Sequence, residues 1–204
     1  YPYGCTEQTL NRFVPTVIAQ KLIKEMGIDL EDVRNKRANL NPQEIGDDKT
    51  RIAQWQRWQR NPVFNEKEVN KMTTAGIKKL REMQLSDGGW GWFSGYGERS
   101  YPHTTAVVMH GLLIAQANGA KMDAGMIGLG INWLKNHEAK ETERIRNWKD
   151  GQKRENNTKR HATAMDAFVR LVLAEAQHPN PEMLGYLFRD KNQLSVYAKA
   201  MTGM

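Results

Sequence analysis

The 204-residue sequence predicts an all-α domain built from helical hairpins. Apolar residues recur at three- and four-residue spacing in several separate stretches, which is the helical period. No stretch of useful length alternates apolar and polar residues as a half-buried strand does. Helix pairs of similar length follow one another, and repeated pairs of about 35 to 45 residues are typical of a solenoid or a closed helical ring. The chain is long enough for one substantial core.

The first predicted helix covers residues 7–26 and ends at Gly27. Pro15 lies inside this run and has no N–H to donate to the preceding turn, so we expect it to kink the helix or to start a new one. The apolar side of the run is formed by Leu10, Phe13, Val14, Val17, Ile18, Leu22 and Ile23.

A polar and irregular segment follows, and we interpret residues 28–65 as an insertion in a single domain that spans residues 1–204. The loop at 84–93 is rich in glycine and aromatic residues, and the almost wholly charged stretch 138–159 predicts a solvated extension or loop. The helix at 104–118 is apolar on most sides and is therefore expected inside the fold. The helices predicted after the insertion are 66–83, 104–118, 123–137, 161–177, 181–189 and 193–201.

The composition argues against some classes of function. A mean hydropathy of −0.71 and the absence of a long apolar run argue against a membrane span. The formal net charge is +7, but Lys and Arg are spread along the chain among Asp and Glu, so we interpret a solvated basic surface and expect no nucleic-acid partner. The basic and aromatic stretch 51–60, with Trp55 and Trp58, keeps a nucleic-acid-binding helical module as an alternative.

The single cysteine excludes an intrachain disulfide, so Cys5 needs an explanation from its own chemistry. It stands three residues before Gln8 in the opening sequence YPYGCTEQT, a spacing that brings two side chains together in helical geometry or in a tight turn. If the Cys5 thiolate attacks the carboxamide carbon of Gln8, ammonia leaves and an internal thioester forms. The alternative without special chemistry is an ordinary buried thiol near a helix start, with Glu7 and Gln8 as residues of the first turn.

A stored thioester survives only where water is excluded until a conformational change exposes it. Tyr1 and Tyr3 are the predicted covers, while Pro2 holds the backbone extended and Gly4 allows a turn that a Cβ would resist. Because the chain opens inside this motif, we expect it to be a piece of a longer polypeptide.

Residues 1–9 closely resemble the thioester motif of bacterial alpha-2-macroglobulins, which vary at the position of Thr6, where vertebrate relatives have glycine. The resemblance covers most of the chain and is weakest between residues 28 and 65. Further segments that resemble the family, in its order and at similar spacing, are PTVIA at 15–19, DGGW at 87–90, TAV at 105–107, NWL at 132–134 and DAFV at 166–169.

The resemblance implies an α/α toroid in which inner and outer helices alternate around about six pairs; roughly five pairs fit here, which leaves room for an incomplete ring. It also implies that a surface amine of an attacking protease attacks the Gln8 carbonyl after proteolysis elsewhere in the full protein, and that an amide and a free Cys5 thiol result. Each molecule reacts once, so the family suggests a protease inhibitor of bacterial defence rather than an enzyme, with no cofactor and no metal.

The partners implied by the resemblance are target proteases or other surface amines, linked covalently, and other domains of the same polypeptide. The family places such proteins in the periplasm or outside the cell, and association with the bacterial envelope stays open. Some members use a histidine to direct the acyl group to hydroxyls; its place here falls near Trp148, which favours amines or water as acceptors.

His103 is the next candidate for assisting acyl transfer, because it precedes a buried helix, although a histidine there is more often a cap or a surface residue. His110 is expected in the core. The remaining histidines, which show no partner pattern for a metal site, are His137, His161 and His178.

The loop around Trp90 is also similar to the aromatic repeats of terpenoid cyclases and prenyltransferases, which are α-toroid enzymes. That chemistry needs an acid cluster or a zinc site. The adjacent aspartates Asp47 and Asp48 lie in the polar insertion and the sole cysteine is already assigned, so this alternative ranks below the thioester.

Overall fold

The computed structural model describes residues 4–30, 62–95, 97–150 and 157–203, and every regular element within these ranges is a helix. The predicted all-α class is therefore confirmed. The helices are α1 Thr6–Asn11, α2 Val14–Glu25, α5 Glu66–Met83, α6 Pro102–Ala117, α7 Ala124–Arg146, α8 Ala164–Glu175, α9 Pro181–Arg189 and α10 Val196–Met201, with short 3-10 helices η1 Pro62–Phe64 and η2 Lys191–Gln193. Sequence predictions that fall outside the described residues concern Tyr1, Pro2, Tyr3, Asp47, Asp48, the stretch 51–60 and most of the insertion 28–65.

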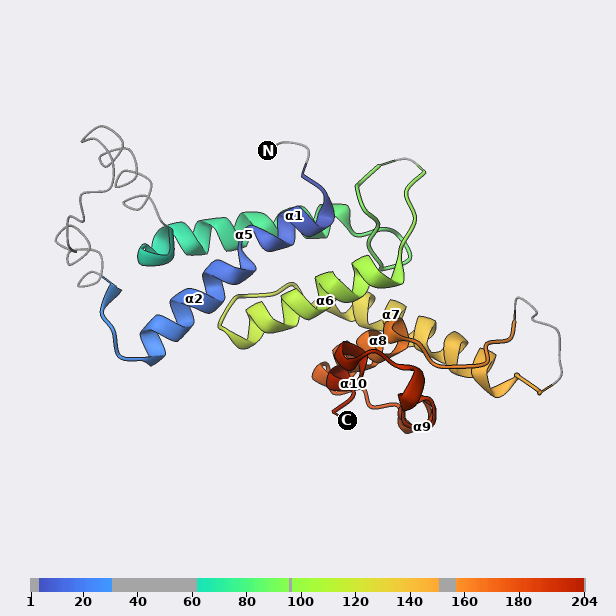
Figure 1. Cartoon of the computed structure of the whole chain (residues 1–204). Coiled ribbons are helices and arrows are strands. Elements are labelled where there is room, and N and C mark those ends of the chain that lie inside the picture. Colours follow the sequence, from blue (N-terminus) through green and yellow to red (C-terminus); the bar gives the residue numbers. More distant parts are fainter. Residues whose placement is uncertain (1–3, 31–61, 96, 151–156, 204) are drawn as a thin grey trace, which may run out of the picture.

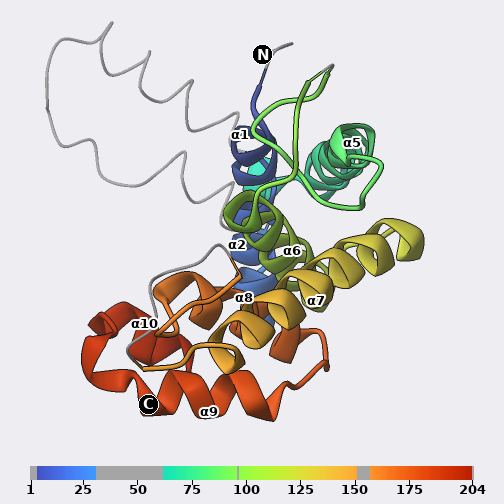
Figure 2. The same ribbon diagram turned by 90° about the vertical axis from the view of Figure 1, so that its right-hand side faces the viewer.

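Alternate helices form two rows. Helices α1 and α2 pack on α6, α6 packs on α8, and α8 packs on α10, so these helices make one continuous row. Helix α5 packs on α1 and α2, α7 packs on α6 and α8, and α9 packs on α7 and α8, which places a second row beside the first (Figure 2). In Figure 1, α1 lies in the upper part of the arrangement and α10 in the lower part. This alternation is that of an α/α toroid, seen here as an open arc, and it confirms the predicted fold class.

The predicted helix at 7–26 is in fact two helices, α1 and α2, with a break around Phe13. Pro15 lies in the first turn of α2, where a missing N–H leaves no helical hydrogen bond unmade, so it starts a helix as one of its two predicted roles requires. The buried Phe13 ring occupies space that Gly76 of α5 leaves free, and Leu10 packs in the same way against Gly111 of α6. These contacts fix α1 and the following Phe13 against α6 and α5.

Helix α6 lies inside the fold, as its apolar sequence predicts. It contacts α1 and α2 on one side and α7 and α8 on the other. Its apolar residues with no exposed surface are Ala106, Val108, Met109, Leu112 and Ala115.

The prediction of a loop at 138–159 is wrong for its first part, because α7 continues to Arg146. Glu138, Thr142 and Ile145 recur at helical spacing and are all buried, while the residues between them carry the charges that face solvent. Glu141 and Arg144 form an ion pair at 2.7 Å within this turn. A helix whose buried side is narrow and largely polar looks like a solvated segment in the sequence.

Helix α8 begins at Ala164, three residues later than predicted, because Thr163 and Asp166 form a capping box. The Asp166 carboxylate accepts the Thr163 N–H at 2.6 Å and its hydroxyl at 2.7 Å. Lys159 reaches the same carboxylate, with its Nζ 2.6 Å from Asp166 Oδ2 and 2.6 Å from Glu141 Oε2. One ammonium group thus ties α7 to the start of α8.

A second buried carboxylate, Asp190, joins the end of α9 to the start of α8. It accepts hydrogen bonds from the Ala162 N–H at 2.8 Å and from Arg189 Nη2 at 2.7 Å, and it lies 3.1 Å from His161 Nδ1. Burial alone would raise the pKa of Asp190, but these donors outweigh it and lower the pKa from 3.8 to about 2.

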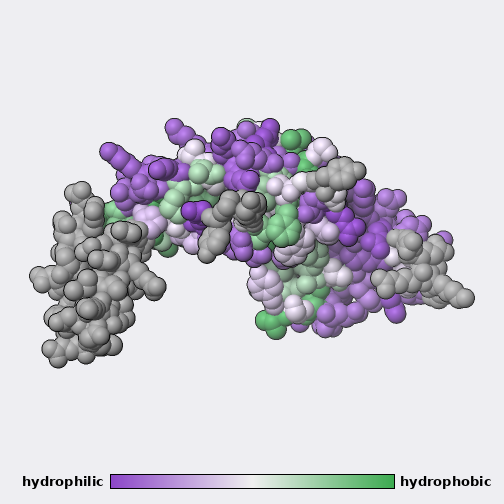
Figure 3. Space-filling view, turned by 90° about the horizontal axis from the view of Figure 1, so that it is seen from above, coloured by the Kyte–Doolittle hydropathy of each residue, from purple (hydrophilic) through white to green (hydrophobic). Residues whose placement is uncertain are grey.

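Within the described ranges, no helix combines the length and the apolar character needed to span a bilayer. The face of the molecule in Figure 3 is mainly hydrophilic and carries small, separate apolar patches.

Candidate functional site

Cys5 and Gln8 are held together by a reciprocal cap at the start of α1. Cys5 is the N-cap residue with an extended backbone, and its Sγ accepts the backbone N–H of Gln8 at 3.5 Å. In return the side-chain Oε1 of Gln8 accepts the backbone N–H of Cys5 at 3.4 Å. This is the capping-box arrangement with a sulfur in place of the usual hydroxyl. The thiol and the carboxamide named from the sequence therefore lie on one side of the same turn.

Thr6, between them, was not among the residues singled out from the sequence. Its side chain has no exposed surface, and its hydroxyl donates to the carbonyl of Gly91 at 2.7 Å and lies 3.2 Å from that of Trp92. Its backbone N–H also donates to the Trp92 carbonyl, at 3.0 Å. The turn is thus fastened to a loop more than eighty residues away in the sequence. No local pattern in the motif signals this contact.

The loop that receives Thr6 is itself fixed by Trp90. The Trp90 side chain is fully buried, and its indole N–H donates to the Leu80 carbonyl of α5 at 2.8 Å. Its backbone N–H donates to Thr105 Oγ1 of α6 at 3.0 Å. Trp92 and Phe93, by contrast, are 45% and 56% exposed, so of these three aromatic residues only Trp90 packs into the fold.

Asp87 closes the base of this loop. Its carboxylate accepts hydrogen bonds from the Ser100 hydroxyl at 2.6 Å, the Gly89 N–H at 3.1 Å and the Trp133 indole N–H at 2.9 Å. Burial works to raise the pKa of Asp87, but these donors together hold it below its ordinary value. The sequence DGGW therefore builds a rigid turn, which explains its aspartate in structural terms.

The described residues leave the Cys5–Gln8 turn accessible. The Gln8 side chain is exposed and Cys5 is half-buried. A Cβ at Gly4 would meet nothing closer than 3.7 Å, so the space around this residue does not itself require glycine. The predicted covers Tyr1 and Tyr3 lie outside the described residues.

The histidines have other partners. His103 is exposed at the start of α6, with its ring centroid 6.3 Å from that of Phe168. His110 is half-buried rather than a core residue. Its Nδ1 lies 2.7 Å from a carboxylate oxygen of Glu175. Neither has a hydrogen bond to Cys5 or Gln8 in the described part of the chain. Trp148 donates its indole N–H to Asp150 at 3.4 Å.

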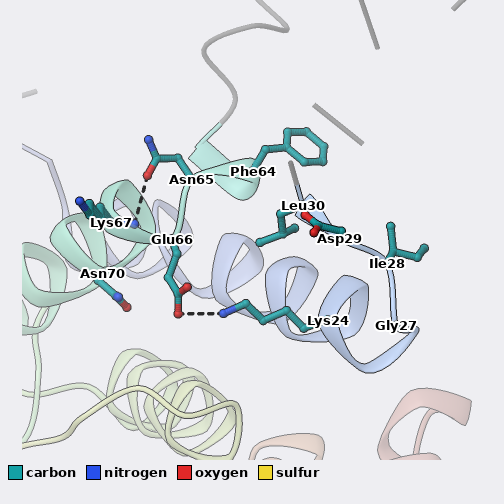
Figure 4. A pocket seen from close by; sticks show the side chains of 10 residues that line it. All are labelled: Lys24, Gly27, Ile28, Asp29, Leu30, Phe64, Asn65, Glu66, Lys67 and Asn70. Carbon is teal, nitrogen blue, oxygen red and sulfur yellow. Dashed lines mark hydrogen bonds and ion pairs between the residues drawn. The ribbon is translucent and has the colours of Figure 1, made fainter. Parts of the chain in front are cut away.

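Among the residues described, no group of three or more His, Cys, Asp or Glu side chains could hold a metal ion. A pocket of about 840 Å³ lies between the end of α2 and the start of α5, at the far end of α2 from Cys5. Figure 4 shows Lys24 and Glu66 joined across it, at 2.8 Å. The sequence predictions give this pocket no role.

The sequence was compared with known proteins. No family model matches it. Among curated proteins, it is 28% identical over 137 residues to the alpha-2-macroglobulin of Thermotoga maritima, a match that covers 67% of this chain and 6% of that protein. The chain therefore spans a small part of the length of this relative.

Solved structures share the fold over the whole chain. A mutant of Salmonella alpha-2-macroglobulin matches with a TM-score of 0.61 and 19% identity, and a C-terminal part of native alpha-2-macroglobulin from Escherichia coli matches with a TM-score of 0.57 and 20% identity. The Salmonella protein reacted with methylamine gives a TM-score of 0.57 and 19% identity. Each match covers 100% of this chain, but only 11%, 27% and 11% of the three solved chains.

Proposed function

We propose, on the premise that this chain is a homologue of the bacterial alpha-2-macroglobulins, that Cys5 and Gln8 form an internal thioester with which the whole protein traps attacking proteases. The observation that carries this proposal is the reciprocal cap, in which two hydrogen bonds of 3.4 and 3.5 Å hold the thiol and the carboxamide in one turn. We assign these residues to the thioester domain of a longer polypeptide, with residues 28–65 as an insertion.

The cap suits the chemistry of thioester formation. The Cys5 sulfur attacks the Gln8 side-chain carbon, so that an Sγ–Cδ bond forms, the Cδ–Nε2 bond breaks, and the thiol proton leaves with the nitrogen as ammonia. The Cys5 N–H already donates to Oε1, the oxygen that gains negative charge in the tetrahedral intermediate. The Gln8 N–H points at the sulfur and stabilises negative charge there during the attack.

Release is an acyl transfer to an external nucleophile. An amine nitrogen bonds to the Gln8 Cδ, the Sγ–Cδ bond breaks, and the proton of the amine goes to the Cys5 sulfur. The products are an amide that links the protease to position 8 and a free thiol. Because the acyl group is consumed, the protein acts once, as an inhibitor and not as an enzyme.

The exposure of Gln8 has two consequences for this mechanism. It lets a lysine side chain of a protease reach the acyl carbon without rearrangement of the described helices. It also requires a cover from a surface outside those residues, since a thioester open to water hydrolyses before it meets a target. Proteolysis of a bait segment elsewhere would remove that cover.

Because position 148 holds a tryptophan rather than a histidine, we propose that amines, rather than hydroxyls, accept the acyl group. With family resemblance as the support, we place the protein in the periplasm or outside the cell, where it meets foreign proteases in bacterial defence.

The test uses the complete polypeptide that contains these residues, purified without heat or amines. Its intact mass should be one ammonia below that of its sequence. Methylamine should add at Gln8, as mapped by peptide mass, and release one titratable thiol. The matched control is Cys5→Ser, which keeps a good N-cap and so leaves the fold unchanged, but should show the full mass and take up no methylamine.

The trapping step is tested separately. A protease that cleaves the protein should become linked to position 8 through a lysine, and pretreatment with methylamine should abolish the link. Full sequence mass together with a titratable Cys5 in fresh protein would falsify the thioester. An intact thioester that never captures protease would remove only the trapping function.

A further inference from the structure

We infer that Thr6 is a positioning residue for the proposed thioester, because its hydroxyl fastens the turn between Cys5 and Gln8 to the loop at residues 91 and 92. This inference rests on the proposed function. It assigns a role to a motif position that the chemistry of the thiol and the carboxamide does not use.

The contact is short, buried and local to the reacting atoms. The Thr6 hydroxyl lies 2.7 Å from the Gly91 carbonyl oxygen and 3.2 Å from that of Trp92, and the side chain has no exposed surface. The Trp92 carbonyl also accepts the Thr6 N–H at 3.0 Å. Since Thr6 directly follows Cys5 and precedes Gln8 by two residues, its fixation limits movement of both reacting groups.

The loop is a rigid anchor for this contact. Trp90, next to Gly91, is fully buried and hydrogen-bonded to α5 through Leu80 and to α6 through Thr105. On the other side, Glu98 accepts the Phe93 N–H at 3.1 Å and packs so closely on Gly91 that no Cβ fits there. The position of the Gly91 carbonyl is thus set by α5, α6 and Glu98 together.

The local structure of α1 cannot replace this anchor. The bond from the Cys5 N–H to Gln8 Oε1 is long, at 3.4 Å, and both residues face solvent in part. Loss of the Thr6 hydroxyl leaves the buried Gly91 carbonyl without its donor, so that the Thr6 N–H bond to Trp92 alone ties the turn to the loop and the turn moves more. The expected result is that water reaches the Gln8 acyl carbon more often, breaks the Sγ–Cδ bond and leaves a carboxylate at position 8 with a free Cys5 thiol.

The experiment compares Thr6→Val, which keeps the shape and removes the hydroxyl, with Thr6→Ser, which keeps the hydroxyl, both in the complete polypeptide. The readout is the rate at which the intact mass of the thioester form rises by the mass of one water, together with thiol release, in buffer without amines. Thr6→Val should lose its thioester on the order of tenfold faster than the parent protein, the factor expected for one buried hydrogen bond. Thr6→Ser should lose it at the parental rate.

The matched control is Thr73→Val, which removes another buried threonine hydroxyl, one that bonds at 2.7 Å to Val69 within α5. It should keep the parental hydrolysis rate. The inference is overturned if Thr6→Val hydrolyses at the parental rate, or if Thr6→Ser or Thr73→Val hydrolyses as fast as Thr6→Val. Should Thr6→Val fail to fold, Thr6→Ser decides: the parental rate supports the inference and a faster rate overturns it.

The two levels of failure are distinguishable. A parent protein without an ammonia deficit removes the proposed function, and the role of Thr6 with it. If the parent protein has the deficit but Thr6→Val loses its thioester at the parental rate, only the role of Thr6 is removed.

Discussion

Leu10 of α1 and Gly111 of α6 meet with no room for a side chain between them, since a Cβ at position 111 would lie 2.8 Å from Leu10 Cδ2. Both residues are buried, and Leu10 is surrounded by the main core. We expect Gly111→Ala to push α1 away from α6 and to lower the free energy of unfolding by about 1–3 kcal/mol, the usual range for an overpacked core. Urea denaturation measures the effect.

The control for this substitution is Gly128→Ala in α7. A Cβ at Gly128 would meet nothing within 4 Å, and alanine favours the helical backbone that glycine disfavours. Gly128→Ala should therefore raise the free energy of unfolding by up to about 1 kcal/mol. Equal effects of the two substitutions would show that the contact with Leu10 is unimportant.

The depressed pKa of Asp190 predicts a loss of stability in acid. The pKa is about 2 in the folded chain against an ordinary value of 3.8, so the folded state binds fewer protons. The stabilisation is present above about pH 4 and is lost as the pH falls towards 2, with a total of roughly 2 kcal/mol. Chemical denaturation at a series of pH values between 5 and 2 measures the slope.

In Asp190→Asn this contribution to the slope should disappear, because the group no longer titrates. The variant should also be less stable than the parent at neutral pH, where the carboxylate is hydrogen-bonded to the Ala162 N–H, His161 and Arg189. An unchanged acid slope in the variant would assign the loss to other carboxylates.

Gln8→Glu separates the cap from the chemistry. A glutamate oxygen can accept the Cys5 N–H as Oε1 of Gln8 does, and a negative charge in the first turn of a helix is favourable, so stability should change by less than about 0.5 kcal/mol. No ammonia can leave, so the intact mass should equal the sequence mass, and Cys5 should titrate at once. Methylamine uptake by a correctly folded Gln8→Glu protein would place the acyl group elsewhere.

Lys159 balances two carboxylates at the start of α8. Its Nζ lies 2.6 Å from both Glu141 and Asp166, and its side chain is only 15% exposed. Lys159→Met leaves the two carboxylates close together, with Asp166 lacking a cation and Glu141 paired with Arg144 alone, so we expect a loss of about 3 kcal/mol in the free energy of unfolding. Lys79→Met is the control, since the 3.9 Å pair of Lys79 with Glu82 is solvent-exposed and should contribute little. Thermal unfolding of both variants decides the matter.

Much of the helical fold follows from the apolar spacing. The buried helix α6 and the role of Pro15 could be predicted because both depend on residues close together in the sequence. The burial of Phe13 at the break between α1 and α2 could not, since it depends on the gap that Gly76 leaves on a distant helix. The end of α7 was missed because charged side chains hide its narrow buried side, formed by Glu138, Thr142 and Ile145.

The same distinction applies to the candidate site. The approach of Cys5 and Gln8 follows from their three-residue spacing and is visible in the sequence. The bond from Thr6 to Gly91 joins segments far apart along the chain, and a threonine in the sequence does not indicate which distant acceptor its hydroxyl will bind. The exposure of Trp92 was likewise hidden, because an aromatic loop has the same composition whether it packs inward or not.

The shortness of α1 has a consequence for biosynthesis. A helix of six residues does not persist by itself in water, and this one is held by Gly91 and Trp92 and by packing against Gly111. The capped turn therefore cannot take shape on the ribosome before those later residues have emerged. The proposed thioester can form only after residues 91, 92 and 111 have been made, and until then the nascent chain carries an ordinary thiol and an ordinary amide.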